Sequence, residues 1–202
     1  MPATEFITSS ILLDKVKDVD NQFSWDQFYD LYHPLIIAFC KQKGCRDEMA
    51  YDVLQECMVT LVRILPDFNY NPVKGNFRSF LLKIVERRIN DAFRREKLLQ
   101  KTSPNVKTDF FNQLEDPNAN TCEKEWDKLW AYNLLKIALE KVKIRINYVT
   151  FQSFKMYVLE KKNPANVANE LKLNKNTVFQ HKNRVTRLLQ QEVNKLKQEL
   201  GE

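Results

Sequence analysis

Apolar side chains recur through most of the chain at intervals of three and four residues, the spacing that puts them on one face of an α-helix. Segments rich in proline, asparagine or glycine separate these amphipathic stretches. Only three glycines interrupt 202 residues, and good helix formers are common, so we expect an all-α fold. The predicted helices cover about residues 24–43, 47–65, 77–97, 123–142 and 148–161, followed by a short helix over 163–171 and a longer one from 174.

Particular residues indicate where the first two helices begin. Ser24 followed three residues later by Gln27 is typical of a capping box, so the first helix is expected to start there. Asp47 is expected to be the N-cap of the second helix. Pro34 lies inside the first helix and should kink or divide it.

Two segments lack helical periodicity and predict how the chain is divided. Residues 66–76 combine proline, asparagine and glycine, and we expect a loop there with two exposed aromatic rings, Phe68 and Tyr70. Residues 98–121 have the composition of a flexible linker. We therefore predict two small helical domains, over residues 1–97 and 122–202, and the second ends in a helix-turn-helix formed by the last two helices.

The net charge of +6 is distributed unevenly along the chain. Residues 74–101 hold nine basic and three acidic side chains, and residues 142–202 hold twelve basic and five acidic ones, whereas the remaining segments are net acidic. Clustered lysine and arginine bind nucleic acid by releasing its condensed counterions, so two basic blocks indicate a polyanionic partner. The alternative is a pair of solvated helix faces.

The sequence contains no recognisable pattern for catalysis or metal binding. The four cysteines form no C-x-x-C pair, and His33 and His181 lie far apart along the chain, so we expect no metal site and no cofactor. We find no glycine-rich phosphate loop or nucleophile–base pattern and expect a protein that is not an enzyme. No signal peptide or long apolar run is visible, which predicts a cytoplasmic protein without membrane insertion.

Three predicted helices carry polar side chains on the face opposite their apolar side. The second helix carries Asp52, Gln55 and Glu56. The third carries a basic stripe formed by Lys83, Arg87, Asn90 and Arg94. The last helix carries residue types that read base edges and hold phosphates, namely Asn176, Gln180, Asn183 and Arg187. A solvated helix face produces the same pattern, so the stripes alone do not choose between the two interpretations.

Together these features resemble the extracytoplasmic-function class of sigma factors, the smallest specificity subunits of bacterial RNA polymerase. Asp52, Gln55 and Glu56 match the D-x-x-Q-E pattern of that family. The stretch GNFRSFLLKI, which begins at Gly75, resembles the family's G-x-F-x-x-W-L-x-x-I, with Phe80 at the usual tryptophan.

The last two predicted helices resemble the helix-turn-helix of the same family. The matching positions are Ala168, Leu171, Thr177, Val178, Arg184 and Leu188. Lys172 stands where the family usually has a glycine in the turn, so a non-glycine residue is expected to accept an unusual backbone conformation. Arg87, in the first domain, is a further departure, because the family often has asparagine there.

The resemblance implies a role in transcription initiation, with RNA polymerase core and promoter DNA as partners. It implies that residues 1–97 bind the clamp helices of the core through Asp52, Gln55 and Glu56. It implies minus-ten recognition and melting by Phe68, Asn76, Lys83, Arg87, Asn90 and Arg94. It assigns minus-thirty-five recognition to Asn176, Thr177, Gln180, Asn183, Arg184 and Arg187. The flap region of the core and an anti-sigma protein are further partners that the resemblance allows.

A different class of protein shares part of this pattern. A dimeric helix-turn-helix regulator would bind a palindrome without polymerase, with half-sites about one helical turn apart. A sigma factor would instead bind two unlike elements as a monomer together with the core enzyme.

Overall fold

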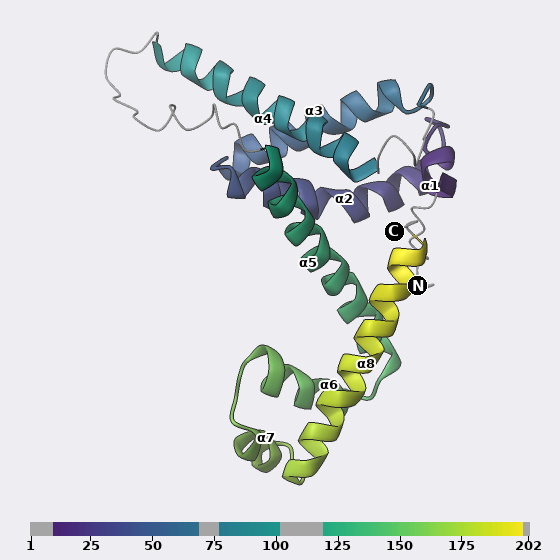
Figure 1. Ribbon diagram of the computed structural model, residues 1–202, viewed down its shortest axis with the longest axis vertical. Helices are drawn as coiled ribbons and strands as arrows, with labels where there is room; N and C mark the ends of the chain where they lie inside the picture. The colour runs from purple at the N-terminus through teal and green to yellow at the C-terminus, as the bar shows by residue number, and fades with distance from the viewer. Residues whose placement is uncertain (1–9, 69–76, 102–118, 200–202) are drawn as a thin grey trace. The chain divides into compact units, whose positions relative to one another are not determined.

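The computed structural model describes residues 10–68, 77–101 and 119–199, and all regular elements in these ranges are helical (Figure 1). The all-α prediction is therefore confirmed for this part of the chain. The elements are α1 (Ser10–Lys15), α2 (Gln22–Gln42), α3 (Asp47–Ile64), α4 (Phe77–Lys101), α5 (Ala119–Arg145), α6 (Tyr148–Phe154), the π-helical turn η3 (Lys155–Leu159), α7 (Pro164–Glu170) and α8 (Lys175–Glu199). None of the helices in these ranges is long and apolar enough to span a membrane.

The chain divides into two compact units, an N-terminal unit that ends at Ala131 and a C-terminal unit that begins at Tyr132. In the N-terminal unit, α3 packs against both α2 and α4 (Figure 1). The apolar stripes predicted for these helices lie inward, and Phe28, Leu61 and Val85 are fully buried. Burial of these stripes is what holds the three helices together.

Aromatic rings attach the start of α4 and the first half of α5 to α2. The centroid of the Phe28 ring lies 4.7 Å from that of Tyr32 and 5.7 Å from that of Phe77. The Tyr32 ring stacks on Trp130, with centroids 5.5 Å apart and planes at 12°. Each such contact contributes about 1 kcal/mol beyond the area it buries.

The boundary between the units lies inside α5, whereas the linker composition of residues 98–121 predicts that the second domain starts at residue 122. Residues 122–131 belong to the N-terminal unit because Trp126 meets the Phe39 ring edge-on at 5.1 Å and Lys43 Nζ lies 2.9 Å from Glu125 Oε2. Of the predicted linker, residues 98–101 continue α4 and residues 119–121 begin α5, and the rest lies outside the described residues.

The N-caps of the first two long helices are other residues than those the sequence predicts. Asn21 is the N-cap of α2, because its side chain accepts a hydrogen bond from the backbone N–H of Ser24, which is buried inside the helix. Pro34 does not divide α2, which continues to Gln42. Asp47 is the first residue of α3 and not its N-cap. At this position its carboxylate still interacts favourably with the positive end of the helix dipole.

The C-terminal unit packs α6, η3 and α7 against α8. One apolar cluster joins Met156 of η3 to Val167 and Ala168 of α7 and Val178 of α8. The single helix predicted over residues 148–161 is present as α6 followed by η3. The short helix predicted over residues 163–171 is α7, and the Asn163 side chain caps it by accepting a hydrogen bond from the backbone N–H of Ala165 at 2.9 Å.

A buried carboxylate ties α8 to the end of α5. Glu192 is 2% exposed, and its two oxygens lie 2.6 Å from Arg145 Nη1 and 3.4 Å from Lys141 Nζ. A buried charge is tolerated when it is paired in this way. The ion triad therefore fixes how the last turns of α5 meet α8.

The connection between α7 and α8 contains a residue in the left-handed region. Lys172 has a φ of 52°. The backbone N–H of Leu173 donates to the carbonyl of Ala168 at 2.8 Å, and that of Lys172 donates to the carbonyl of Asn169 at 3.3 Å. This is the Schellman pattern that closes helices, and its left-handed position is usually glycine.

Lys172→Gly should stabilise the C-terminal unit by about 1 kcal/mol, because glycine adopts the left-handed region without the Cβ clash. Native-state hydrogen exchange of the α7 and α8 amides would measure the change. Lys172→Ala is the matched control, since it removes the same charge but keeps the Cβ and should give no gain. Equal effects of the two substitutions would show that the lysine charge, and not the backbone, matters.

Candidate functional site

The outer face of α3 lines a polar groove of about 640 Å³ between α3 and α4. Asp52 and Gln55, two of the predicted docking residues, are exposed there, and the third, Glu56, is partly buried. The residues that line the groove are Asp52, Gln55, Glu56, Val59, Thr60, Arg63, Arg88 and Arg95. The structure thus brings the three predicted residues together on one surface.

Glu56 is bound to arginines of the neighbouring helix. Its Oε1 lies 2.6 Å from Arg95 Nη2, and its Oε2 lies 3.9 Å from Arg88 Nη1. Arg88 also donates a hydrogen bond to the Thr60 hydroxyl at 2.8 Å, and Thr60 in turn donates to the Glu56 carbonyl. The groove therefore has mixed charge, although the motif taken by itself predicts an acidic surface.

Five residues that line the groove are absent from the predicted docking set, namely Val59, Thr60 and Arg63 of α3 and Arg88 and Arg95 of α4. Tyr51 does not line the groove but is exposed on α3 beside Asp52. The two arginines are seven residues apart and so share a face of α4 that differs from the basic stripe. The sequence shows this spacing, but it does not show that the Arg88 and Arg95 face of α4 contacts Glu56 of α3.

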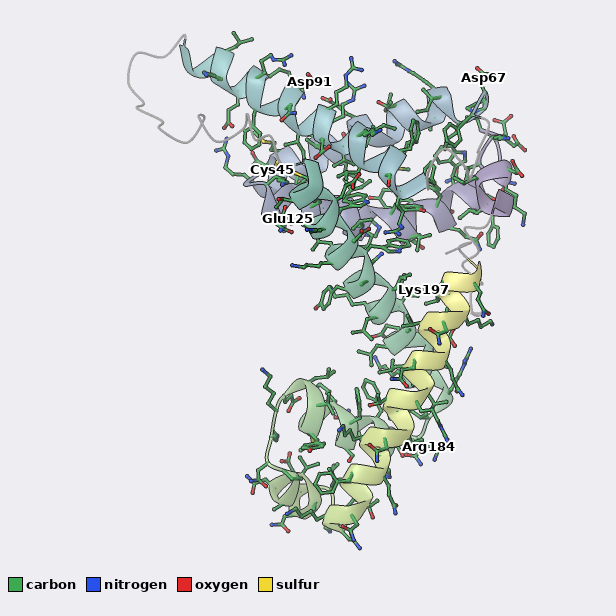
Figure 2. All side chains as sticks on the ribbon, viewed as in Figure 1. Cys45, Asp67, Asp91, Glu125, Arg184 and Lys197 are labelled. Carbon is green, nitrogen blue, oxygen red and sulfur yellow. The ribbon has the colours of Figure 1, made fainter. Side chains whose placement is uncertain are left out.

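The basic stripe of α4 is exposed as predicted. Lys83, Arg87 and Asn90 are exposed, and Arg94 is exposed with its Nη1 3.4 Å from Asp91 Oδ1. Asp91, labelled on α4 in Figure 2, also lies 3.8 Å from Arg88. One acidic residue therefore lies between the stripe and the groove, and most of the stripe's positive charge is available to a polyanion.

The predicted minus-ten pocket is only partly described. Phe68 is partly buried and not the exposed ring that the loop composition predicts, because it stacks on Phe80 at 4.7 Å and meets Phe77 edge-on at 6.1 Å. The free energy gained when Phe68 packs against these rings exceeds the tendency of a polar loop to remain in solvent. Asn76, also predicted for the minus-ten element, and Tyr70, the other ring predicted to be exposed, lie outside the described residues.

The outward face of α8 carries the residues predicted for the last helix. Thr177 is partly exposed, and the others are exposed, namely Asn176, Gln180, Asn183, Arg184 and Arg187. The Asn174 side chain caps this helix by accepting hydrogen bonds from the backbone N–H groups of Asn176 and Thr177. Figure 2 labels Arg184, which lies in the first half of α8.

His181 lies within this polar segment of α8. Burial lowers the pKa of His181 below its usual value of 6.5, and the nearby positive charge of Arg184 lowers it further. Its Nδ1 is buried and has no hydrogen-bond partner. The imidazole is therefore neutral at neutral pH, and the charge of the α8 surface comes from its arginines and lysines.

A second, apolar groove of about 1150 Å³ lies in the C-terminal unit. Leu135 of α5, Phe154 of α6, Leu159 of η3 and Leu189 of α8 are among its lining residues. Leu135 and Leu159 are exposed in it. Exposed apolar surface of this kind commonly marks a protein-binding site.

The cysteines do not form a metal site in the part of the chain that the structure describes. Cys40, Cys45 and Cys57 are buried and free, and burial raises the pKa of Cys57 to about 12. The hydrogen bond between Cys40 and Cys45 raises the pKa of Cys40 and lowers that of Cys45. Cys57 and Cys40 are therefore protonated thiols that fill the core.

Comparison with known families gives an assignment for the helices that carry the polar groove. Residues 28–98 match the family model described as "Sigma-70 region 2". Residues 28–98 are therefore similar to a sigma-70 region 2. This region spans most of α2, all of α3 and most of α4, so the groove and the basic stripe both belong to it.

A curated relative agrees with this assignment. The chain is 34% identical over 79 residues to a protein of Acetivibrio thermocellus named "RNA polymerase sigma factor SigI7". The alignment covers 39% of this chain and 33% of the relative, so the chain spans about a third of the relative that it matches. The family model and the name of the relative both refer to sigma factors, and neither match extends over the whole chain.

The position of His181 predicts how stability depends on pH. Its pKa is lower in the folded chain than in the unfolded one, so the unfolded chain binds more protons below pH 6.5. This contribution to stability should be complete above pH 6.5 and decline as the pH falls toward the folded pKa. An NMR titration of the imidazole should give a pKa below 6.5, and Arg184→Gln should raise it. A value at or above 6.5 would contradict the prediction.

Proposed function

We propose that this protein is a sigma factor that directs RNA polymerase core to promoters. The observation that carries the proposal is that one region 2 holds both a polar docking groove and a separate basic stripe. A protein that joins an enzyme to DNA needs two such surfaces. The name of the curated relative, an RNA polymerase sigma factor, supports the same role.

In this proposal the outer face of α3 binds the clamp helices of the core. Asp52 and Gln55 are exposed and can accept or donate hydrogen bonds to a partner helix. Tyr51 and Val59 are exposed on the same helix and add apolar area, which most protein interfaces contain at their centre. The contact is therefore mixed, with polar groups that set its register and apolar groups that contribute area.

The basic stripe of α4 would hold promoter DNA at the minus-ten element. Lys83, Arg87 and Arg94 lie at helical spacing on one side of α4 and can follow the phosphates of a single strand. Asn90 offers both a donor and an acceptor for a base edge. Phe68 would need to leave its stack on Phe80 before it could contact an unpaired base.

The C-terminal unit would read the minus-thirty-five element as a helix-turn-helix. Helices α7 and α8 are joined by a four-residue connection over residues 171–174, and α8 presents amide and guanidinium groups outward. Arginine pairs with guanine and asparagine or glutamine with adenine in the major groove. This motif, together with region 2, favours the extracytoplasmic-function class within the sigma-70 family.

The apolar groove of the C-terminal unit suits a helix from the flap region of the core. Its exposed Leu135 and Leu159 would be covered by the apolar face of such a helix. An anti-sigma protein that covered the same groove would prevent assembly. Both partners belong to this proposal.

Run-off transcription tests the proposal directly. Purified core polymerase with this protein should begin transcription at discrete sites that share two spaced motifs in a library of genomic fragments. Core polymerase alone should not use those sites. If the protein instead adds no start sites and binds palindromic DNA by itself as a dimer, it is a helix-turn-helix regulator and not a sigma factor.

Two substitutions should separate the docking role from the reading role. Asp52→Lys should weaken binding to the core by about tenfold, because it places a like charge against the partner surface. Arg187→Ala should leave core binding intact and weaken minus-thirty-five recognition by about tenfold. Fluorescence anisotropy with labelled core and with labelled promoter DNA measures both effects. If each substitution weakened both interactions equally, the assigned roles would be wrong.

A further inference from the structure

One predicted docking residue already has a cationic partner inside the molecule. Glu56 belongs to the α3 face that is proposed to meet the core, yet its Oε1 lies 2.6 Å from the guanidinium of Arg95 on α4. Both side chains are partly accessible, with 30% of Glu56 and 54% of Arg95 exposed. A cation from a partner would therefore have to displace Arg95 or share the carboxylate with it.

We propose that Arg95 is an internal competitor for Glu56, and that binding of the core exchanges the Glu56–Arg95 ion pair for one between Glu56 and a cation of the core. The inference rests on the proposed function, since it requires that the α3 face docks on polymerase. In the free protein, Arg95 is paired with Glu56, and this ion pair lowers the affinity of the α3 face for the core.

The structure indicates why Arg95, and not Arg88, is the arginine that leaves Glu56 when the core binds. Arg88 is 32% exposed and is held by a hydrogen bond to Thr60 and by Asp91 as well as by Glu56. Its distance to Glu56 is 3.9 Å, against 2.6 Å for Arg95. Arg95 is the more exposed and can return to water with little loss, because exposed ion pairs contribute little to stability.

The exchange also accounts for the mixed charge of the groove. Two arginines beside a docking carboxylate reduce the net negative charge of the site, but each holds the carboxylate in place until the partner arrives. Arg88 remains bound to α3 through Thr60 after Arg95 leaves. Glu56 therefore keeps its orientation through the exchange.

Removal of the competitor should strengthen core binding. Arg95→Gln is expected to bind the core about two- to fivefold more tightly, the gain that corresponds to loss of one exposed ion pair. Affinity is measured by titration of labelled core with the full chain in the absence of DNA. Circular dichroism melts of each variant check that the fold is intact.

Arg46→Gln is the matched control. Arg46 is 79% exposed and pairs with Glu96 in the same unit, and it does not line the groove. The substitution removes the same charge and also breaks an arginine–glutamate pair, so it controls for the overall field of the protein. It should leave core affinity unchanged.

A double-mutant cycle isolates the pair. Glu56→Gln should weaken core binding, and in that background Arg95→Gln should give no gain, because the competition no longer exists. A gain from Arg95→Gln that persists in the Glu56→Gln background, or tighter binding by Arg46→Gln as well, would overturn the proposal. Weaker binding by Arg95→Gln would also overturn it, since it would make Arg95 a contact of the partner.

The Glu56–Arg95 exchange and the sigma-factor role would be contradicted by different results. If Asp52→Lys weakens core binding but Arg95→Gln does not change it, the competition is wrong and the sigma-factor role stands. If the wild-type chain itself does not bind the core, the proposed function fails, and the exchange fails with it.

Discussion

The aromatic packing of Phe28, Tyr32, Phe77 and Trp130 is the contact on which the N-terminal unit depends. These rings come from α2, α4 and α5, and they fix where α4 begins relative to α2. Because α4 is a single helix, its first residue determines the direction of every later side chain. The position of the polar groove and that of the basic stripe both follow from this contact.

The arginines of α4 show how angular position on a helix decides the role of one residue type. Arg88 and Arg95 face α3 and bind Glu56, whereas Arg87 faces away and is exposed. Neighbouring residues on a helix differ by about 100° in direction, so Arg87 and Arg88 belong to different surfaces. A short basic segment can therefore support a protein surface and a surface for nucleic acid on one helix.

The sequence predicted the helices and the exposed stripes well, because both depend on local periodicity. It placed the start of α4 at Phe77, which is confirmed, and the start of the short helix one residue before Pro164, where α7 begins. It did not predict that Trp126 and Trp130 pack on α2, since that contact joins residues almost a hundred positions apart. The Glu56–Arg95 pair was missed for the same reason, because periodicity describes one helix and not its neighbour.

Glu192 is a buried carboxylate paired with Lys141 and with the exposed Arg145, and this ion triad has a consequence for behaviour on heating. Removal of charged groups from water costs less free energy as temperature rises, because their hydration carries a strongly negative entropy. The gain from burying apolar area levels off over the same range. The junction of α5 with α8 should therefore soften later in a thermal ramp than an apolar contact of the same size would.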